Sequence, residues 1–248
     1  MREVSEHKSF AHNADDILAE VQRNGFEHAQ ESRIRSGTFT AGFLQALGDC
    51  PVEVSLRDKG ADTLLAAGSS DSIVHPLLNP LSMEEMPSHD RHLRFEAWKQ
   101  FLSEYAASKI PVHTHPGGAA YHCPSLADVR ISPSRQYEYN AAFELVVTQL
   151  GIIVYQRLSK GLYEQLFAAA ELLESQHYDL TRAAHEAHKQ KNDVHPALVE
   201  LAQKELLLFK RAGAVIADIL WTDPKIHIIV DTLNRKKTPD EAIDLLKQ

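Results

Sequence analysis

The residues best suited to chemistry form a short group that begins with two histidines. His113 and His115 are separated by one residue, Pro116 follows, and Asp128 comes later in the same region. Alternate residues of an extended strand project to the same side, so the two imidazoles can converge. A carboxylate that folds back onto them gives three protein ligands and leaves one position for water, as in catalytic zinc sites. The sequence therefore predicts a hydrolytic metal site.

Local signals place these ligands on a strand and at the start of a helix. The apolar run 109–112 predicts a short buried strand that leads into the first histidine, and the pair Gly117-Gly118 ends regular structure. Ser125 can then cap a helix that has Asp128 in its first turn. A strand and a helix start would thus bring the ligands together.

The rest of the N-terminal part is predicted to hold two helices, several strands and a hairpin. Ile17, Leu18 and Val21 recur at helical spacing, so the first helix should run to about Ala29, with Glu31 in the extended stretch behind it. The other predicted elements are strands at 38–40 with 43–44, at 52–56 and at 63–67, a helix at 90–108, and a hairpin of 143–148 with 152–155.

From Leu158 onward the pattern becomes mainly helical. The predicted helices lie at 161–176, 179–191 and 196–210, with a short last helix from Thr238. The run 214–221 fits either a continued helix or a strand, whereas the β-branched run 226–230 favours a strand. We therefore expect a core at residues 1–157 and a helical extension at 158–248 that could return a strand to the core.

The motif and the order of elements resemble the JAMM/MPN metalloproteases, zinc enzymes that cleave isopeptide bonds to ubiquitin and ubiquitin-like proteins. Their motif is a distant upstream Glu, then His-x-His-Pro and Ser-x-x-Asp, and the matching residues here are His113, His115, Pro116, Ser125 and Asp128. The resemblance covers roughly residues 13–157. It implies an α/β (α+β) fold, a mixed β-sheet flanked by helices, with a JAMM/MPN (cytidine-deaminase-like) core and a mainly helical C-terminal extension.

The resemblance also implies a role for each motif residue. His113, His115 and Asp128 would hold Zn²⁺, which lowers the pKa of its bound water to about 7. Glu31 would act as the general base that passes the proton of this water to the leaving amine. Ser125 would stabilise the oxyanion as hydroxide attacks the carbonyl. The implied function is a zinc metallopeptidase or isopeptidase acting on a protein or peptide, such as a ubiquitin-like modifier.

The loop between the two halves of the motif differs from the family pattern. It is about two residues longer than usual and contains His122 and Cys123, either of which could be a fourth ligand. A cysteine ligand would close the site and make it structural. We expect Cys123 to lie near the metal without binding it.

The upstream Glu differs as well. Glu31 is followed by Ser32-Arg33-Ile34-Arg35 rather than by a Gly-rich apolar strand, so Glu27 and Glu53 are alternative bases. If no Glu reaches the water, the chain would be a catalytically inactive scaffold that binds metal and mediates protein interactions.

Other metal-binding families share parts of this pattern. Class II aldolases, the alternative enzyme class, need a third His in a later His-Gly pair, where this chain has Leu150-Gly151. Cupins need a Glu soon after the histidine pair, and none occurs between His115 and Asp128. The segment 185–188, His-Glu-Ala-His, lacks one residue of the His-Glu-x-x-His zinc motif and predicts a solvated helix face.

Composition limits the partners and the compartment. The net charge is -8, and the only basic run is the short Arg235-Lys236-Lys237, which argues against nucleic acid and anionic membranes as partners. Two cysteines are too few for a disulfide framework, and no apolar run is long enough to span a bilayer. We therefore expect a reduced cytoplasmic protein, whose amphipathic C-terminal helices could pair two copies in a homodimer.

Overall fold

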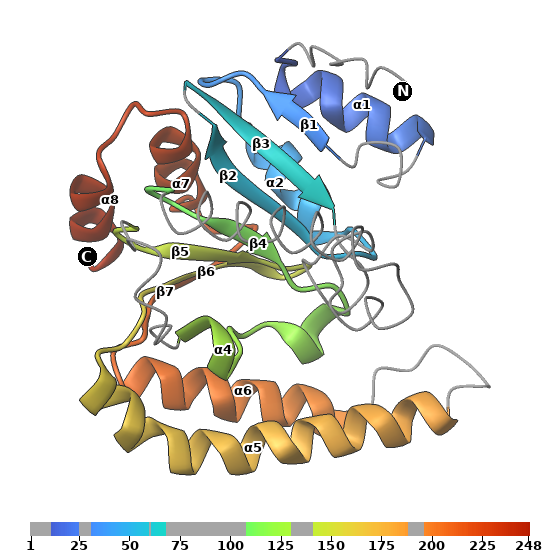
Figure 1. Ribbon diagram of the computed structural model, residues 1–248, viewed down its shortest axis with the longest axis vertical. Coiled ribbons are helices and arrows are strands. Elements are labelled where there is room, and N and C mark those ends of the chain that lie inside the picture. Colours follow the sequence, from blue (N-terminus) through green and yellow to red (C-terminus); the bar gives the residue numbers. More distant parts are fainter. Residues whose placement is uncertain (1–10, 25–30, 60, 68–107, 130–140, 188–195) are drawn as a thin grey trace, which may run out of the picture.

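The computed structural model describes residues 11–24, 31–59, 61–67, 108–129, 141–187 and 196–248 (Figure 1). Within these residues, seven strands form one mixed sheet in the order β1-β3-β2-β4-β5-β6-β7. The strands are β1 (Glu31–Ile34), β2 (Val54–Lys59), β3 (Asp62–Ala67), β4 (Val112–Thr114), β5 (Glu144–Val147), β6 (Gly151–Tyr155) and β7 (Val215–Leu220). The pair β4 and β5 is parallel, and the other neighbouring strands are antiparallel.

Helices cover both faces of this sheet (Figure 1). They are α1 (Ala14–Asn24), α2 (Ala41–Gly48), α4 (Leu126–Val129), α5 (Lys160–Ala187), α6 (Pro196–Arg211), α7 (Ile226–Leu233) and α8 (Pro239–Leu246), with a 3₁₀ turn, η3, at Gly118–Tyr121. One buried apolar cluster joins a sheet face to α1, α2, α7 and α8, and a second joins the opposite face to α4, α5 and α6. The predicted α/β architecture, a mixed sheet flanked by helices, is confirmed at this level.

Most predicted elements of the described residues are present. The first helix, the strand at 63–67, the hairpin, the helix from Ser125 and the helices at 196–210 and after Thr238 all form, and the strand at 52–56 lies two residues later in the chain. The open run 214–221 is β7, which pairs with β6 at the edge of the sheet. The predicted helix at 90–108 lies outside the described residues.

Two predicted strands are wrong, because packing of their apolar residues into the core outweighs β propensity at both places. The stretch around Phe43 is the helix α2, for which the Thr40 hydroxyl accepts a hydrogen bond from the Phe43 N–H as the N-cap. The run 226–230 lies in α7, where Ile226, Ile229 and Thr232 turn to the buried side.

The predicted break near residue 177 is also wrong. The helices expected at 161–176 and 179–191 are the single helix α5, which runs from Lys160 to Ala187. Neither glycine nor proline stands between the two predicted helices, so nothing in the backbone stops the helix there.

A pair of hydrogen bonds ties the start of α2 to the end of α7. The Asn234 side chain accepts from the Phe39 N–H and donates to the Phe39 carbonyl, at 2.8 Å in each case. The amide thus bonds both backbone groups of Phe39, as a neighbouring peptide unit would. Residues 195 positions apart are fixed to each other in this way.

Cys50 and Cys123 are buried thiols that form no disulfide, and burial raises the pKa of Cys50 to about 11 against the opposing effect of a backbone hydrogen bond. In the described segments, no helix is both long enough and apolar enough to cross a bilayer.

Candidate metal centre

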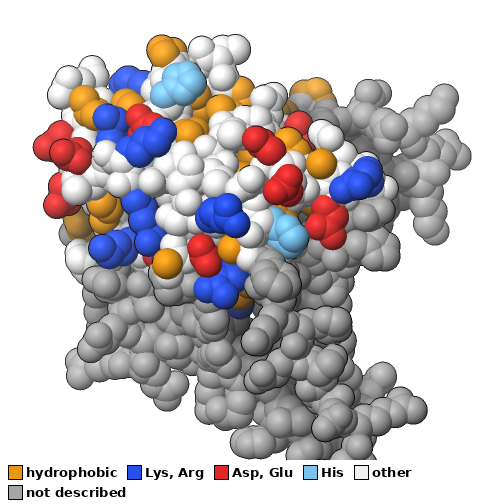
Figure 2. All heavy atoms as spheres, turned by 90° about the horizontal axis from the view of Figure 1, so that it is seen from above, with side chains coloured by type: hydrophobic (Ala, Val, Ile, Leu, Met, Phe, Trp, Pro, Cys, Tyr) orange, Lys and Arg blue, Asp and Glu red, His pale blue; other side chains and the backbone are white. Residues whose placement is uncertain are grey.

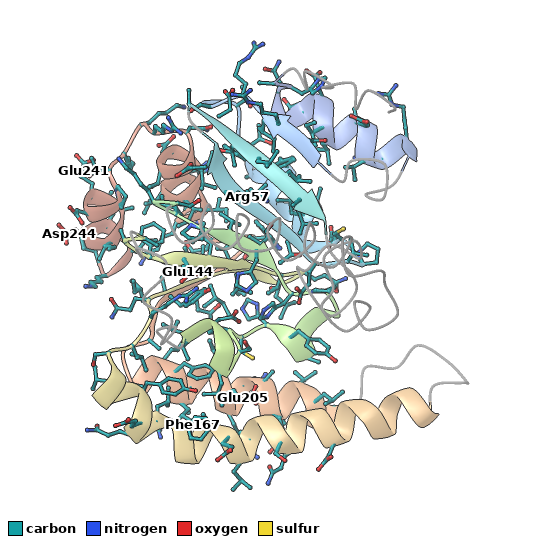
Figure 3. The ribbon with its side chains drawn as sticks, in the orientation of Figure 1. Arg57, Glu144, Phe167, Glu205, Glu241 and Asp244 are labelled. Atoms are coloured by element: carbon teal, nitrogen blue, oxygen red, sulfur yellow. The ribbon has the colours of Figure 1, made fainter. Side chains whose placement is uncertain are left out.

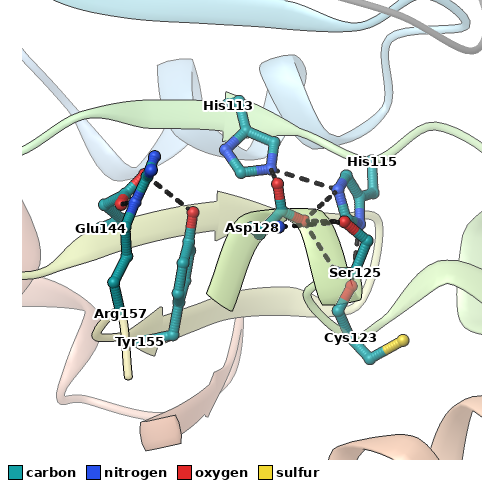
Figure 4. Close-up of polar contacts among 8 residues, drawn as sticks. All are labelled: His113, His115, Cys123, Ser125, Asp128, Glu144, Tyr155 and Arg157. Carbon is teal, nitrogen blue, oxygen red and sulfur yellow. Dashed lines mark hydrogen bonds and ion pairs between the residues drawn. The ribbon is translucent and has the colours of Figure 1, made fainter. Parts of the chain in front are cut away.

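The two motif histidines and the aspartate converge on one point (Figure 4). His113 lies in β4, His115 directly follows that strand, and Asp128 lies in α4. The two Nε2 atoms are 3.1 Å apart, and each is 3.4 Å from Asp128, His113 from Oδ1 and His115 from Oδ2. Among the described residues, these three form the one group of His, Cys, Asp or Glu side chains arranged to hold a metal ion.

The spacing of the ligand atoms fits a small tetrahedral cation. Zinc bonds of about 2.0–2.1 Å place neighbouring ligand atoms of a tetrahedron about 3.3 Å apart. The separations of 3.1 and 3.4 Å lie on either side of that value. Asp128 presents a different oxygen to each histidine. Its carboxylate could bind the metal ion through both oxygens, or through one oxygen after a small rotation. The donor set can therefore hold a metal ion.

The Ser-x-x-Asp part of the motif is also a helix cap. The Ser125 N–H donates to Asp128 Oδ2 at 2.7 Å, and the Ser125 hydroxyl accepts from the Asp128 N–H at 3.2 Å. These reciprocal bonds make a capping box, here with Asp in place of the usual Glu. The same hydroxyl donates to Asp128 Oδ2 at 2.8 Å. Ser125 thus starts the helix and fixes the carboxylate in front of the histidines.

A backbone carbonyl fixes the proton of His115. His115 Nδ1 lies 2.8 Å from the carbonyl oxygen of Cys123, which can only accept a hydrogen bond. Nδ1 therefore carries a proton, which leaves Nε2 as the atom of the neutral ring that can bind a metal ion. Such an outer hydrogen bond is the usual companion of a metal-bound histidine.

His122 is engaged away from the three ligands. Its Nδ1 lies 2.6 Å from Thr148 Oγ1, and its Nε2 lies 2.9 Å from Asp218 Oδ1 in β7. Lys210 of α6 donates to the other oxygen of Asp218 at 2.7 Å. His122 therefore anchors the motif loop to the hairpin and to β7 and is not a fourth ligand in this arrangement.

Cys123 is likewise outside the ligand group. Its thiol donates to Glu205 Oε2 at 3.3 Å, and the glutamate belongs to α6 and is buried. Figure 3 shows Glu205 on α6, the helix whose apolar residues pack in the same cluster as Cys123. The expectation that Cys123 lies near the ligands without joining them agrees with this geometry. The carbonyl of Cys123 accepts the hydrogen bond from His115, while the Cys123 side chain connects the loop to α6.

The charges at the ligands favour an ionised aspartate. Burial alone would raise the pKa of Asp128, but the imidazoles of His113 and His115 beside it hold that pKa well below its usual range. Burial lowers the pKa of His113, but the Asp128 carboxylate outweighs burial and leaves the pKa raised. A carboxylate that stays ionised at neutral pH is ready to bind a cation.

Glu31 shares a row of the sheet with His113. Strand pairing places Glu31 opposite Ala66, Ala66 opposite Ser55, and Ser55 opposite His113. Three strand spacings of about 4.8 Å separate the two ends of the row by about 14 Å. Ala66 and Ser55, the positions between, have small side chains and are buried. The side chain of Glu31 lies outside the described residues, as does all of Glu27, so the general base stays a prediction.

A buried cluster beside His113 was not predicted. Glu144 is fully buried in β5 and accepts hydrogen bonds from the Tyr155 hydroxyl, at 2.9 Å, and from Arg157 Nε (Figure 4). The Tyr155 ring meets the His113 ring edge to face, with centroids 6.2 Å apart. One signal was present in the sequence, a carboxylate inside the otherwise apolar run Phe143 to Val147. Its partners come from β6 and the residues just after that strand, so the run alone did not reveal them.

Comparisons with protein-family models, with curated proteins and with solved structures found no match to this chain.

Proposed function

We propose that this chain is a zinc-dependent metallopeptidase or isopeptidase of the JAMM/MPN type, acting on a protein or peptide such as a ubiquitin-like conjugate. The observation that carries the proposal is the convergence of His113, His115 and Asp128 at tetrahedral spacing, with Ser125 bonded to the aspartate. Two imidazoles and one carboxylate leave a position for water, the arrangement of hydrolytic rather than structural zinc sites.

Zinc held at this site supplies a water molecule whose pKa is lowered to about 7. In the proposal, Glu31 accepts the proton of that water and delivers it to the nitrogen of the leaving amine. Ser125 stabilises the oxyanion with its hydroxyl proton, which Asp128 Oδ2 accepts in the present arrangement. With Asp128 holding the metal, that hydrogen bond would be weaker, and the Ser125 hydroxyl would be able to donate to the substrate oxygen instead.

We assign the base to Glu31 because it stands at the upstream position of the motif. Glu31 lies three strands from His113, in a row whose intermediate members have small side chains. Glu53, the alternative base, comes immediately before β2 and only two residues from Ser55, which pairs directly with His113. Because this row is long, a second function remains a candidate. If Glu31 does not reach the water, the chain is a metal-binding scaffold without catalysis.

Metal content tests the proposal first. Elemental analysis of the purified chain should find about one zinc per molecule. The double variant His113→Ala/His115→Ala should contain none, while Glu200→Gln, a surface change on α6, should retain the wild-type content. Circular dichroism of each variant shows whether it is folded. A folded wild-type chain that holds no zinc after purification and zinc addition would overturn the proposal.

Cleavage separates the enzyme from the scaffold. An isopeptide-linked ubiquitin-like conjugate and a peptide library are incubated with the wild-type chain and with Glu31→Gln. The enzyme requires that wild type cleaves one of them and that Glu31→Gln loses about 10²–10⁴-fold in rate while its zinc content stays unchanged. Full activity of Glu31→Gln would reject Glu31 as the base, and bound zinc without cleavage of any conjugate would favour the scaffold.

A further inference from the structure

A cavity of about 490 Å³ lies away from the three metal ligands. It is bounded by β2, by the residues leading into β4, and by the loop between α7 and α8. Leu56 and Val112 line it, and both belong to the apolar cluster on the face opposite α5 and α6. His113, the next residue of β4, contacts Tyr155, which belongs to the other cluster. The cavity and the metal ligands therefore lie on opposite faces of the sheet.

The lining of this cavity is basic although the chain as a whole is acidic. Five cationic residues contribute to its lining, and only two acidic ones do. The cationic residues are Arg57, Lys109, Arg235, Lys236 and Lys237. The net charge of the whole chain is -8. Seen from above, Lys and Arg side chains gather on the side where the α7–α8 loop lies (Figure 2). The net charge of the residues that line the cavity thus has the opposite sign to the net charge of the whole chain.

Both acidic side chains in the lining already have partners. Asp58 accepts from the backbone N–H of Lys109 at 3.1 Å, and its other oxygen lies 3.7 Å from Arg235. Glu241 accepts from the N–H of Thr238, at 2.7 Å, and from its hydroxyl, at 2.9 Å, and so caps α8. Both carboxylates are therefore already engaged, and their two negative charges are too few to balance the five positive charges.

Two of the cations are open to a ligand. Within the described residues, the ammonium groups of Lys109 and Lys237 form no ion pair or hydrogen bond, whereas Lys236 lies 3.6 Å from Asp231. Lysine ammonium groups bind phosphate as point charges without a fixed geometry. Among the described residues, the site therefore offers two ammonium groups that are not held in an ion pair.

The backbone keeps the basic loop in a conformation that favours glycine. Arg235, two residues after the end of α7, has a φ of 60°, in the left-handed region. Its N–H donates to the Thr232 carbonyl, and the Lys236 N–H donates to the Asp231 carbonyl. These are the two bonds of a Schellman motif, where glycine is the usual residue at this position. An arginine at this position adds a positive charge to the cavity lining, although glycine would adopt the same backbone conformation without strain.

Apolar side chains form the rest of the lining. Phe39, Leu56, Ile110, Val112 and Leu233 line the same cavity as the cations. Its volume falls within the range of about 300–1,000 Å³ that is usual for small-molecule sites. We propose that this cavity binds a small phosphate-bearing molecule with an aromatic or apolar body, of the size of a nucleoside monophosphate. Its phosphate contacts Lys109 and Lys237, and its body contacts the apolar side chains.

Isothermal titration calorimetry tests this site with three probes, AMP, adenosine and inorganic phosphate. AMP should bind at least tenfold more tightly than inorganic phosphate, because it also fills the apolar part, and adenosine should give no detectable heat. The variant Lys109→Gln/Lys237→Gln should weaken AMP binding at least tenfold. The matched control is Lys204→Gln, which removes an exposed lysine of α6 that pairs with Glu200, and it should bind AMP within twofold of wild type.

Three outcomes would overturn the site. AMP could fail to bind, it could bind no better than adenosine or inorganic phosphate, or the double lysine variant could bind it as wild type does. The third outcome also covers phosphate held at the metal ligands, because a phosphate bound there does not depend on Lys109 or Lys237. The test is therefore independent of the zinc content and of the proposed peptidase activity. Melting curves of both lysine variants confirm that each is folded.

Discussion

Glu144 is the residue whose charge is most deeply enclosed beside the metal ligands. It is fully buried, and its two oxygens are bonded to Tyr155 and Arg157. Replacing one member of a buried ion pair leaves the other charge without compensation, at a cost of about 3–5 kcal/mol. Glu144→Gln should therefore lower the free energy of unfolding by about that amount in urea denaturation.

A surface ion pair supplies the matched control for Glu144. Glu200 and Lys204 are 2.7 Å apart on the exposed side of α6. Exposed pairs of this kind contribute little, because water and salt screen them. Glu200→Gln should leave the urea midpoint unchanged within error. Equal, small effects of the two substitutions would show that the Glu144 pair does not support the fold.

At the residue scale, the ligands were predictable and their supports were not. His113, His115, Ser125 and Asp128 lie close together in the sequence, so their spacing alone indicated a shared site. The supporting bonds come from distant segments, such as Thr148 and Asp218 for His122 or Glu205 for Cys123. Pairing across strands decides which of these meet, and one sequence does not specify that register.

At the scale of elements, His122 and Asp218 join four parts of the fold. His122 follows η3, Thr148 begins the hairpin turn, Asp218 lies in β7 and Lys210 in α6. Hydrogen bonds from His122 and Lys210, against the opposing effect of burial, lower the pKa of Asp218 to about 2 from an ordinary 3.8. These bonds therefore stabilise the folded state whenever Asp218 is ionised.

The pH dependence of stability follows from that lowered pKa. Because the folded pKa lies below the unfolded one, the contribution is complete above pH 3.8 and is lost as pH falls toward 2. Asp218→Asn should lower the free energy of unfolding by about 2 kcal/mol at pH 6. The difference from wild type should shrink between pH 4 and pH 2, as urea titrations at several pH values would show.

Asp244 provides the comparison for this pH effect. It lies on the exposed side of α8. Asp244→Asn should change the free energy of unfolding little at pH 6 or at pH 2, because an exposed carboxylate is similarly solvated in the folded and unfolded states. A difference between Asp218→Asn and wild type that stays constant from pH 6 to pH 2 would contradict the assigned role of Asp218.

Elements were predicted well where sequence signals agreed and poorly where they conflicted. The last helix carries Thr238, Pro239 and Glu241 in the order of a capping box, and the structure contains that box. In α7, β-branched residues favoured a strand, but the apolar cluster formed with α2 and α8 selects a helix. A tertiary contact made that choice, so local propensity could not anticipate it.

At the scale of the whole molecule, the residues after Arg157 complete the fold of the residues before it. β7 pairs with β6, and Ile219, Ile226, Ile229 and Leu246 lie in the same apolar cluster as α1 and α2. A chain ending at Arg157 should therefore not unfold cooperatively, and its near-ultraviolet circular dichroism should lack the signals of packed aromatic residues. If that shorter chain instead folds and retains zinc, these residues are dispensable for the site.

The bond between Asn234 and Phe39 has a consequence for the time course of synthesis. Its two residues are 195 positions apart, which at about 5–20 residues per second separates their emergence by roughly 10–40 s. Throughout that interval the residues of α2 lack both the amide that bonds Phe39, just before the helix, and the α7 residues that pack against them. The nascent chain thus exposes apolar surface that the finished protein buries, and cells that synthesise it would need to shield that surface from aggregation.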